Sequence, residues 1–211
     1  MTTILAFDTA TVSCSAALLR GTEVIEQFAV APRQHGQRLL PMIDRLLKEA
    51  GIEVSDCDAI AFGNGPGSFM GLRIAAGVAQ GLAFGADLPV IPISTLQTLA
   101  QTAFEATGSP RVLAAWDARM SQIYWGLYSE QEGLMMPEQA DQLSDPDQIE
   151  IPEGVLVAGN AWSEDPETLY YPRARSLAIL AADAWQNGRA TDPQSIDIAY
   201  LRNRVAEKPT R

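Results

Sequence analysis

The residues best suited to chemistry form a glycine-rich loop at positions 63–74, with the sequence Gly-Asn-Gly-Pro-Gly-Ser-Phe-Met-Gly-Leu-Arg-Ile. Glycine permits positive φ and close approach by another group, and proline fixes φ, so the loop has a defined shape. A loop of this kind at a helix N-terminus can hold an anion. It lacks the Gly-Lys-Ser/Thr of a P-loop and the glycine spacing of a dinucleotide site. Phosphate binding and a tight strand-to-helix turn therefore both stay open.

Two aspartates, Asp8 and Asp117, each end an apolar run and could position a metal-bound nucleotide. The turns that follow them read Thr-Ala-Thr and Ala-Arg-Met, with side chains where a phosphate cradle needs glycine. Near position 159 the run Ala-Gly-Asn has only one of the two glycines that usually flank an adenosine. We therefore favour a structural role for both aspartates over autonomous ATP hydrolysis.

Metal and hydrolase chemistry have little support. His35 is the only histidine, and it is expected to be a surface hydrogen-bonding residue near a helix start. Cys14 and Cys57 are far apart, which favours buried reduced thiols over a disulfide or a metal site. No Ser-His-Asp or Cys-His array has a credible partner for the histidine. We expect no metal and no cofactor.

The net charge of -11 has a local origin. Residues 121–172 contain eleven acidic residues and no Lys or Arg, while the rest of the chain has fifteen of each sign. Such a lobe would repel a phosphate backbone, so the protein should not bind nucleic acid by itself; most of these acids are expected to be a solvated surface. Without a basic leader, or an apolar run near the ~20 residues that span a bilayer, the cytoplasm is the expected location and no membrane contact is expected.

The first half of the chain predicts the order βββαβαβα. An apolar stripe ending at Gly51 marks the first helix, and the sequence Ser-Thr-Leu-Gln from Ser94 has the spacing of a capping box. The expected strands are 3–8, 14–19, 23–30, 59–62 and 90–93, and the expected helices follow 39–47, 71–85 and 94–106.

The second half starts again at Val112. The run Leu-Ala-Ala-Trp-Asp at 113–117 repeats Ile-Leu-Ala-Phe-Asp at 4–8, and each is followed by a turn and another strand. We predict two lobes, 1–106 and 107–211, in which the C-terminal tail can pack back on the first lobe. Further expected elements are strands at 123–129 and 155–158 and a helix at 176–186. A duplicated α/β fold of this order resembles the two-lobed architecture of actin, Hsp70 and the sugar kinases.

The helix at 71–85 carries Gly77, Gly81 and Gly85 at i+4 spacing on one face. Glycine costs about 1 kcal/mol per helical site relative to alanine, so close approach of another element should offset that cost. The sequence leaves open whether this is internal packing or a subunit contact that includes the stripe at 39–47.

Four motifs together resemble the TsaB family, also called YeaZ, of bacterial tRNA threonylcarbamoyladenosine biosynthesis proteins. They are Asp-Thr-Ala-Thr at 8–11, the loop at 63–74, Trp-Asp-Ala-Arg at 116–119 and Tyr-Leu-Arg at 200–202. The resemblance implies a catalytically silent relative of TsaD, the subunit that transfers threonylcarbamoyl to N6 of adenosine 37 in tRNAs reading codons that begin with A. TsaD has a His-x-x-x-His metal pair where this chain has Thr95 and Leu99.

The resemblance further implies a scaffold that binds TsaD through first-lobe helices, recruits the ATPase TsaE, reaches tRNA only through the complex and can form a homodimer when alone. The rival function is an autonomous nucleotide-dependent phosphotransferase of the same fold. The implied partner interface comprises Leu39, Leu40, Ile43, Leu47, Arg73, Gly77, Gly81 and Gly85. The implied vestigial nucleotide site comprises Asp8, Thr9, Gly65, Gly67, Ser68, Asp117, Arg119 and Gly159.

Overall fold

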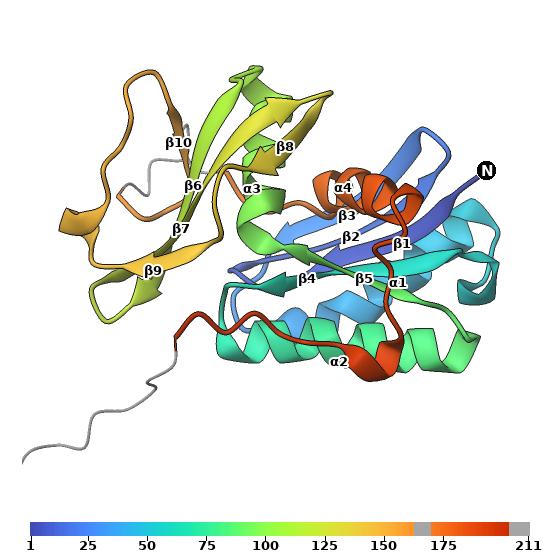
Figure 1. The fold of residues 1–211 in the computed structure, drawn as a ribbon. Helices are drawn as coiled ribbons and strands as arrows, with labels where there is room; N and C mark the ends of the chain where they lie inside the picture. The colour runs from blue at the N-terminus through green and yellow to red at the C-terminus, as the bar shows by residue number, and fades with distance from the viewer. Residues whose placement is uncertain (163–169, 203–211) are drawn as a thin grey trace, which may run out of the picture.

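The computed structural model describes residues 1–162 and 170–202 and contains two β-sheets with helices around them (Figure 1). The elements in chain order are β1 (Thr3–Asp8), β2 (Ser13–Arg20), β3 (Glu23–Val30), α1 (His35–Ala50), η1 (Val54–Asp56), β4 (Ala59–Gly65), α2 (Phe69–Ala86), β5 (Val90–Ser94), α3 (Thr95–Thr107), β6 (Arg111–Arg119), β7 (Gln122–Gln131), β8 (Leu134–Pro137), β9 (Gln142–Ser144), η2 (Pro146–Gln148), β10 (Leu156–Ala158), α4 (Ala174–Gln186) and η3 (Pro193–Ser195).

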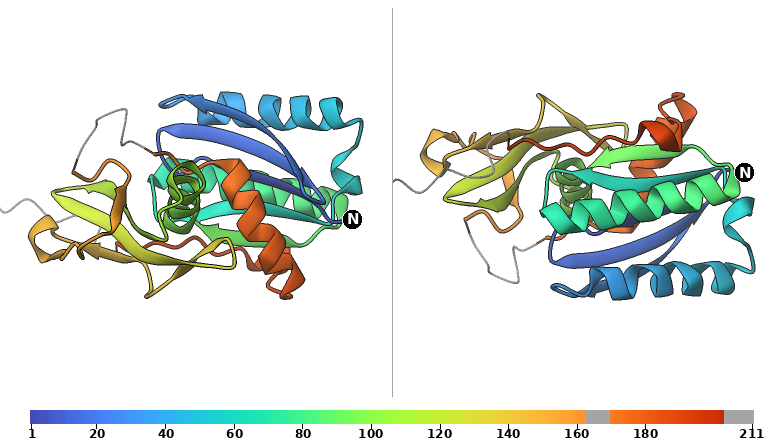
Figure 2. Two further views of the ribbon diagram at one scale, coloured as in Figure 1. Left: turned by 90° about the horizontal axis from the view of Figure 1, so that it is seen from above. Right: turned by 90° about the horizontal axis from the view of Figure 1, so that it is seen from below.

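The first sheet has the strand order β3-β2-β1-β4-β5 and is covered on both faces. Because side chains alternate along a strand, Leu5 and Phe7 face one side of β1 while Ile4 and Ala6 face the other. The first side packs against α1 and α2, and the second packs against α4. Figure 2 shows α1 and α2 side by side on the same face. This three-layer packing explains why every residue of β1 is buried.

The second sheet has the order β10-β6-β7-β8, with β9 also paired to β7. The antiparallel pair β6–β7 with β10 parallel to β6 repeats the antiparallel pair β1–β2 with β4 parallel to β1. The α3 helix packs on one face of this sheet through Leu96 and Leu99. The predicted duplicated, two-lobed α/β fold is therefore confirmed.

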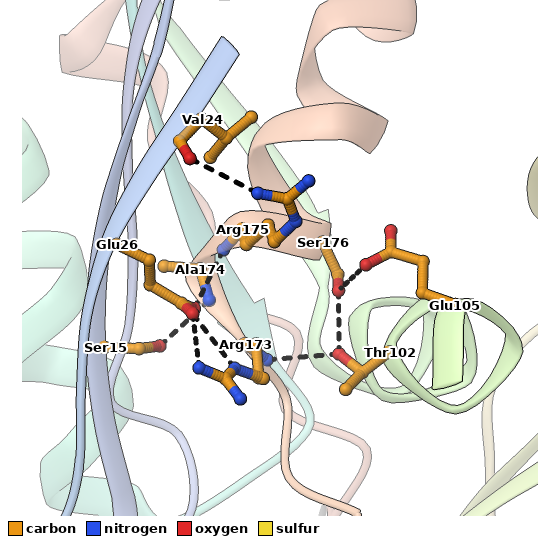
Figure 3. A network of polar contacts seen from close by, with 9 residues as sticks. All are labelled: Ser15, Val24, Glu26, Thr102, Glu105, Arg173, Ala174, Arg175 and Ser176. Carbon is orange, nitrogen blue, oxygen red and sulfur yellow. Dashed lines mark hydrogen bonds and ion pairs between the residues drawn. The ribbon is translucent and has the colours of Figure 1, made fainter. Parts of the chain in front are cut away.

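Helix α4 follows the second lobe in sequence but packs on the first sheet (Figure 3). Its N-terminal amides are bound by other elements: Ser15 Oγ accepts the N–H of Ala174 and the Glu26 carboxylate accepts the N–H of Arg175. Thr102 Oγ1 of α3 accepts the N–H of Arg173. The division of the chain into lobes at 106/107 stays a prediction. Helix α4 packs on the sheet of the first lobe, and α3 packs on the sheet of the second.

Local capping signals located the helix ends well. Ser94 Oγ accepts the N–H groups of Leu96 and Gln97, so α3 begins where the capping spacing predicts. Gly51 ends α1 in the left-handed conformation. Ser68 caps α2 and accepts the N–H of Gly71, so this helix begins two residues before the prediction. The short strands β8 and β9 were not predicted.

Helix α2 corrects the expectation that no apolar run approaches a membrane-spanning length. It has 18 residues with a mean hydropathy of 1.3, which is long and apolar enough to cross a membrane by length and composition alone. One face, with Leu72, Ala75, Ala79 and Ala83, is buried in the core of the first lobe. The apolar character of α2 therefore has a packing role in this fold.

Candidate functional site

The glycine loop packs against the β1–β2 turn and leaves little space there for a phosphate. A Cβ on Gly67 would lie 2.6 Å from the carbonyl oxygen of Ala10, and a Cβ on Gly71 would overlap the carbonyl oxygen of Thr9. Ser68 N–H donates to the Ala10 carbonyl at 2.7 Å, and Thr9 Oγ1 donates to the Gly71 carbonyl at 2.7 Å. These glycines permit a close approach between two chain segments, which favours the tight-turn alternative.

Asp8 lies beneath this turn and is completely buried. Its Oδ1 accepts the N–H of Ala10 at 2.9 Å, and Thr95 Oγ1 lies 3.4 Å from its Oδ2. Gly63 provides the space, because a Cβ there would overlap the carboxylate. Burial raises the pKa of Asp8 to about 6, although the hydrogen bonds from Ala10 and Thr95 act in the opposite direction. The Asp8 carboxylate is therefore enclosed and bonded within the turn.

A cavity of about 420 Å³ lies between the two lobes. Of the eight residues assigned to a vestigial nucleotide site, Gly67, Ser68, Asp117 and Arg119 line it. Asp8, Thr9, Gly65 and Gly159 do not line this cavity. Gly159 has φ of +111° and lies against the carbonyl of Ala115, so its role is close backbone packing. The structure thus brings half of the predicted set together.

Asp117 is engaged within its own turn. Its carboxylate accepts the N–H of Arg119 at 2.7 Å and pairs with the Arg119 guanidinium at 3.0 Å. Its own N–H donates to Asn160 Oδ1 at 2.8 Å. Since 83% of the Arg119 side chain is exposed, the ion pair is weakly stabilising. These contacts match the structural role favoured for this aspartate.

The two α3 positions that the resemblance matches to a histidine pair, Thr95 and Leu99, are enclosed. Thr95 is 2% exposed and Leu99 is fully buried in the second-lobe core. Neither side chain has an imidazole. Over residues 1–162 and 170–202, no group of three or more His, Cys, Asp or Glu side chains is placed to hold a metal ion.

The structure tests the expectations for the two cysteines, the histidine and the acidic segment. Cys14 and Cys57 are free buried thiols, as predicted, and burial raises the pKa of each to about 11. The expectation that His35 lies on the surface is wrong, because it is 8% exposed and its Nε2 lies 3.1 Å from the Ser13 carbonyl. In the acidic segment, Asp141 is also not a solvated group: it accepts from Ser94 at 2.6 Å and from Tyr128, and burial raises its pKa.

The glycine face of α2 points away from the protein. Gly77, Gly81 and Gly85 are exposed, and a Cβ built on any of them meets no atom within 4 Å. Internal packing within the described part of the chain therefore does not explain them. A groove of about 620 Å³ between α1 and α2 is bordered by Leu47, Gly81 and Gly85. We call the surface formed by Leu40, the partly buried Leu47, Arg73 and the three glycines the α1–α2 face.

Two residues assigned to that interface belong to the core instead. Leu39 is fully buried and Ile43 is 3% exposed, and both pack beneath α1 against the first sheet. Leu40 is 50% exposed. The apolar residues of α1 extend from its buried side onto its exposed side. Their spacing in the sequence therefore does not tell which of them face the core and which face solvent.

Sequence reasoning missed several residues of the inter-lobe cavity. Tyr124 of β7 and the tail residues Ala199, Tyr200 and Arg202 line it together with Trp116. The run Tyr-Leu-Arg at 200–202 was noted as a family motif but was given no position in the fold. Its placement depends on a contact between segments more than 80 residues apart.

The fold and the inter-lobe cavity define the class of two-lobed, actin-like α/β proteins. The family model for TsaD, described as tRNA N6-adenosine threonylcarbamoyltransferase, matches residues 24–205. The TsaB protein of Escherichia coli is 38% identical over 97% of this chain and 96% of its own length. The Haemophilus influenzae TsaB is 40% identical over 98% of this chain and 96% of its own length.

Solved structures agree with the sequence relatives. YeaZ from Pseudomonas aeruginosa superposes with a TM-score of 0.87 at 41% identity, covering 95% of this chain and 100% of that one. A second Pseudomonas aeruginosa structure, described as similar to peptidase YEAZ, has a TM-score of 0.90 at 41% identity over 96% of this chain and 100% of that one. The chain belongs to the TsaB (YeaZ) family.

Proposed function

We propose that this protein is a non-catalytic scaffold for the transfer of threonylcarbamoyl to N6 of adenosine 37 in tRNA. In this proposal it binds TsaD through the α1–α2 face, and TsaE joins the assembled complex in the cytoplasm. The names of the relatives, tRNA threonylcarbamoyladenosine biosynthesis proteins, support the pathway. The uncovered glycine stripe of α2 is the observation that supports the contact.

The exposed glycines of α2 lower the stability of the isolated helix. Three exposed glycines in one helix cost about 3 kcal/mol relative to alanine, since each costs about 1 kcal/mol. No neighbour in the described chain uses the space that they leave. A partner helix can use that space, because a face without side chains allows two helix axes to approach to ~8 Å. Leu40 and Leu47 border the same face and supply apolar contact.

Catalytic silence is supported by side-chain chemistry. Thr95 and Leu99 offer no imidazole where TsaD has its metal ligands, and both are buried. Asp8 is enclosed, and Asp117 is bound by its own turn. The acidic segment of the second lobe would repel tRNA, so tRNA contact through the partner is the simpler arrangement.

The experiment is the substitution Gly81→Leu, with Ala106→Leu as a matched control on the exposed side of α3. At Gly81 the added side chain points into solvent in the isolated protein. We expect an unchanged or slightly higher melting temperature and loss of TsaD binding in sizing chromatography and calorimetry. The control should bind TsaD normally. Binding of TsaD by Gly81→Leu at wild-type affinity would overturn the interface.

Sizing chromatography of the isolated protein also tests the homodimer. If the same face joins two copies, Gly81→Leu should convert a dimer to a monomer, because both copies would present the substituted surface. Calorimetry with Mg-ATP tests the rival phosphotransferase function. The scaffold should bind Mg-ATP weakly or only with TsaD present, whereas tight binding by the isolated chain would favour the rival.

A further inference from the structure

The chain that follows α4 runs back along α2. Thr191 forms a bridge with Val90 at the edge of the first sheet, and Gln80 Nε2 of α2 donates to the Pro193 carbonyl at 3.0 Å. Ile196 and Ile198 then pack against the first-lobe core. Figure 1 shows this segment, in red, following α2 toward the second lobe.

Residues 199–202 next contact the end of β4 and the start of α2 in the first lobe. The N–H of Ala199 donates to the Asn64 carbonyl at 2.9 Å. Gly65, at φ of +113°, has no side chain at the point where the Ala199 carbonyl passes, and a Cβ there would lie 2.9 Å from that oxygen. The Tyr200 ring lies 6.3 Å from the Phe69 ring, and the Arg73 guanidinium lies 5.7 Å from the Tyr200 ring centroid.

The same segment then contacts the β6–β7 turn of the second lobe. Arg202 Nη2 donates to the Arg119 carbonyl and to Gln122 Oε1, each at 3.0 Å. Arg119, Met120 and Ser121 all have positive φ, from 57° to 63°, which is an unfavourable conformation for residues other than glycine. A contact from Arg202 therefore helps to hold a turn that local preferences do not favour.

These residues also form one wall of the inter-lobe cavity. Ala199, Tyr200 and Arg202 line it together with Trp116 and Tyr124. This wall joins the two lobes, because it bonds to Asn64 of the first sheet and to Arg119 of the second.

The contacts of residues 199–202 with the two lobes are incomplete at Tyr200 and Arg202. Tyr200 is 45% exposed. The Nε of Arg202 is buried, and among residues 1–162 and 170–202 it has no hydrogen-bond acceptor. A buried donor without a partner is unfavourable, so this weakens the contact of Arg202 with the second lobe. A segment with a single backbone hydrogen bond to the first sheet, from Ala199 to Asn64, and partly exposed side chains belongs to the parts of a protein that open most easily.

We propose that residues 199–202 are a reversible strap. When attached, the strap holds the two lobes together across their gap and closes the cavity. When it detaches, the cavity opens to solvent and the β6–β7 turn loses its support, while both sheets stay folded. The proposal concerns the isolated chain and does not depend on any partner.

Hydrogen exchange of the full chain, measured by mass spectrometry, tests the strap. The double substitution Tyr200→Ala with Arg202→Ala removes both side-chain attachments, and Ala199→Pro removes the N–H donated to Asn64. Arg38→Ala, on the exposed side of α1, is the matched control for loss of one arginine. We expect exchange at least tenfold faster in peptides covering 196–202 and 118–123 of both strap variants, with unchanged exchange in β1 and α1.

Two results would overturn the strap. Exchange at 118–123 within twofold of wild type in both variants would show that the tail does not support the turn. Faster exchange throughout β1 and α1 would show that the tail is an integral part of the first-lobe fold and not a detachable segment. The control variant should match wild type in every peptide.

Discussion

Glu26 on β3 and Arg173 at the start of α4 form an ion pair across 147 positions of sequence, with Arg173 Nη2 2.6 Å from Glu26 Oε2. The carboxylate is only 9% exposed and also accepts the N–H of Arg175. The guanidinium lies 4.5 Å from the Phe28 ring centroid. One side chain of the first lobe therefore caps and anchors a helix that follows the second lobe.

Substitution Glu26→Ala is expected to lower the free energy of unfolding by about 1–3 kcal/mol, because it removes a helix cap and leaves the Arg175 N–H without its acceptor. Glu26→Gln keeps an acceptor oxygen and should lose less. Glu23→Ala, at an exposed position of the same strand, is the control. Urea unfolding measures all three, and equal effects of Glu26→Ala and Glu23→Ala would contradict the anchor.

Asp8 should make stability depend on pH. Its pKa is raised from 3.8 to about 6 in the folded protein, so the folded state binds the proton more tightly than the unfolded state. The free energy of unfolding should therefore fall as pH rises from about 4 to about 6, by on the order of 3 kcal/mol from this group. Asp8→Asn should remove that part of the decrease.

The measurement is urea unfolding at pH 4.5 and pH 7 for wild type and Asp8→Asn. Asp44→Asn, a change of an exposed carboxylate on α1, is the control. A pH dependence of Asp8→Asn equal to that of wild type would show that Asp8 titrates normally.

Neither aspartate of the two hairpins should be needed for tRNA modification. Asp8 is enclosed and Asp117 is bound by its own turn, so Asp8→Asn and Asp117→Asn should each leave the reconstituted reaction with TsaD and TsaE within tenfold of wild type. A hundredfold loss, equivalent to ~2.7 kcal/mol in transition-state free energy, would mean that the aspartate handles charge in the reaction.

Leu39 and Leu40 should behave oppositely although they are neighbours. Leu39→Ala opens a cavity in the first-lobe core and should cost about 2–5 kcal/mol of stability. Leu40→Ala should change stability by less than about 0.5 kcal/mol but weaken TsaD binding about tenfold. Thermal melts and calorimetry measure the two effects. A destabilised Leu40→Ala with normal binding would place Leu40 in the core.

Gly71 and Gly85, both in α2, should also respond oppositely to alanine. At Gly71 the new methyl group would overlap the Thr9 carbonyl, so Gly71→Ala should destabilise the protein by more than about 2 kcal/mol. At Gly85 the space is open, so Gly85→Ala should stabilise the isolated chain by about 0.5–1 kcal/mol. Urea unfolding of the two variants measures both changes in the free energy of unfolding. Equal tolerance at both sites would show that the glycine loop is looser than its contacts indicate.

Much of the fold could be predicted from local signals. The Ser94 cap and the left-handed Gly51 each mark a helix end through hydrogen bonds within a few residues, so sequence spacing was enough to find them. The strands β8 and β9 were missed because they are short and their pairing with β7 gives them stability that their own residues do not.

The candidate site was less predictable. The glycine loop at 63–74 was compatible with a phosphate site or with a tight turn, because glycine suits both. Only the position of the Ala10 carbonyl against Gly67 favoured the turn. Likewise, periodicity placed Leu39 and Leu40 in one stripe, and only the first sheet separated the buried side chain from the exposed one.

Motifs and periodicity are local properties of the chain, so the amino-acid order alone was enough to predict the family, the strand and helix order of the first lobe and the repeated Asp-tipped hairpin. Four features appear only in the folded arrangement: α4 packs on the first sheet, Asp8 is enclosed, Gly77, Gly81 and Gly85 face outward, and 199–202 cross between the lobes. Each of these depends on contacts between residues far apart in sequence, whose free energy comes from burial and pairing that no short segment encodes alone.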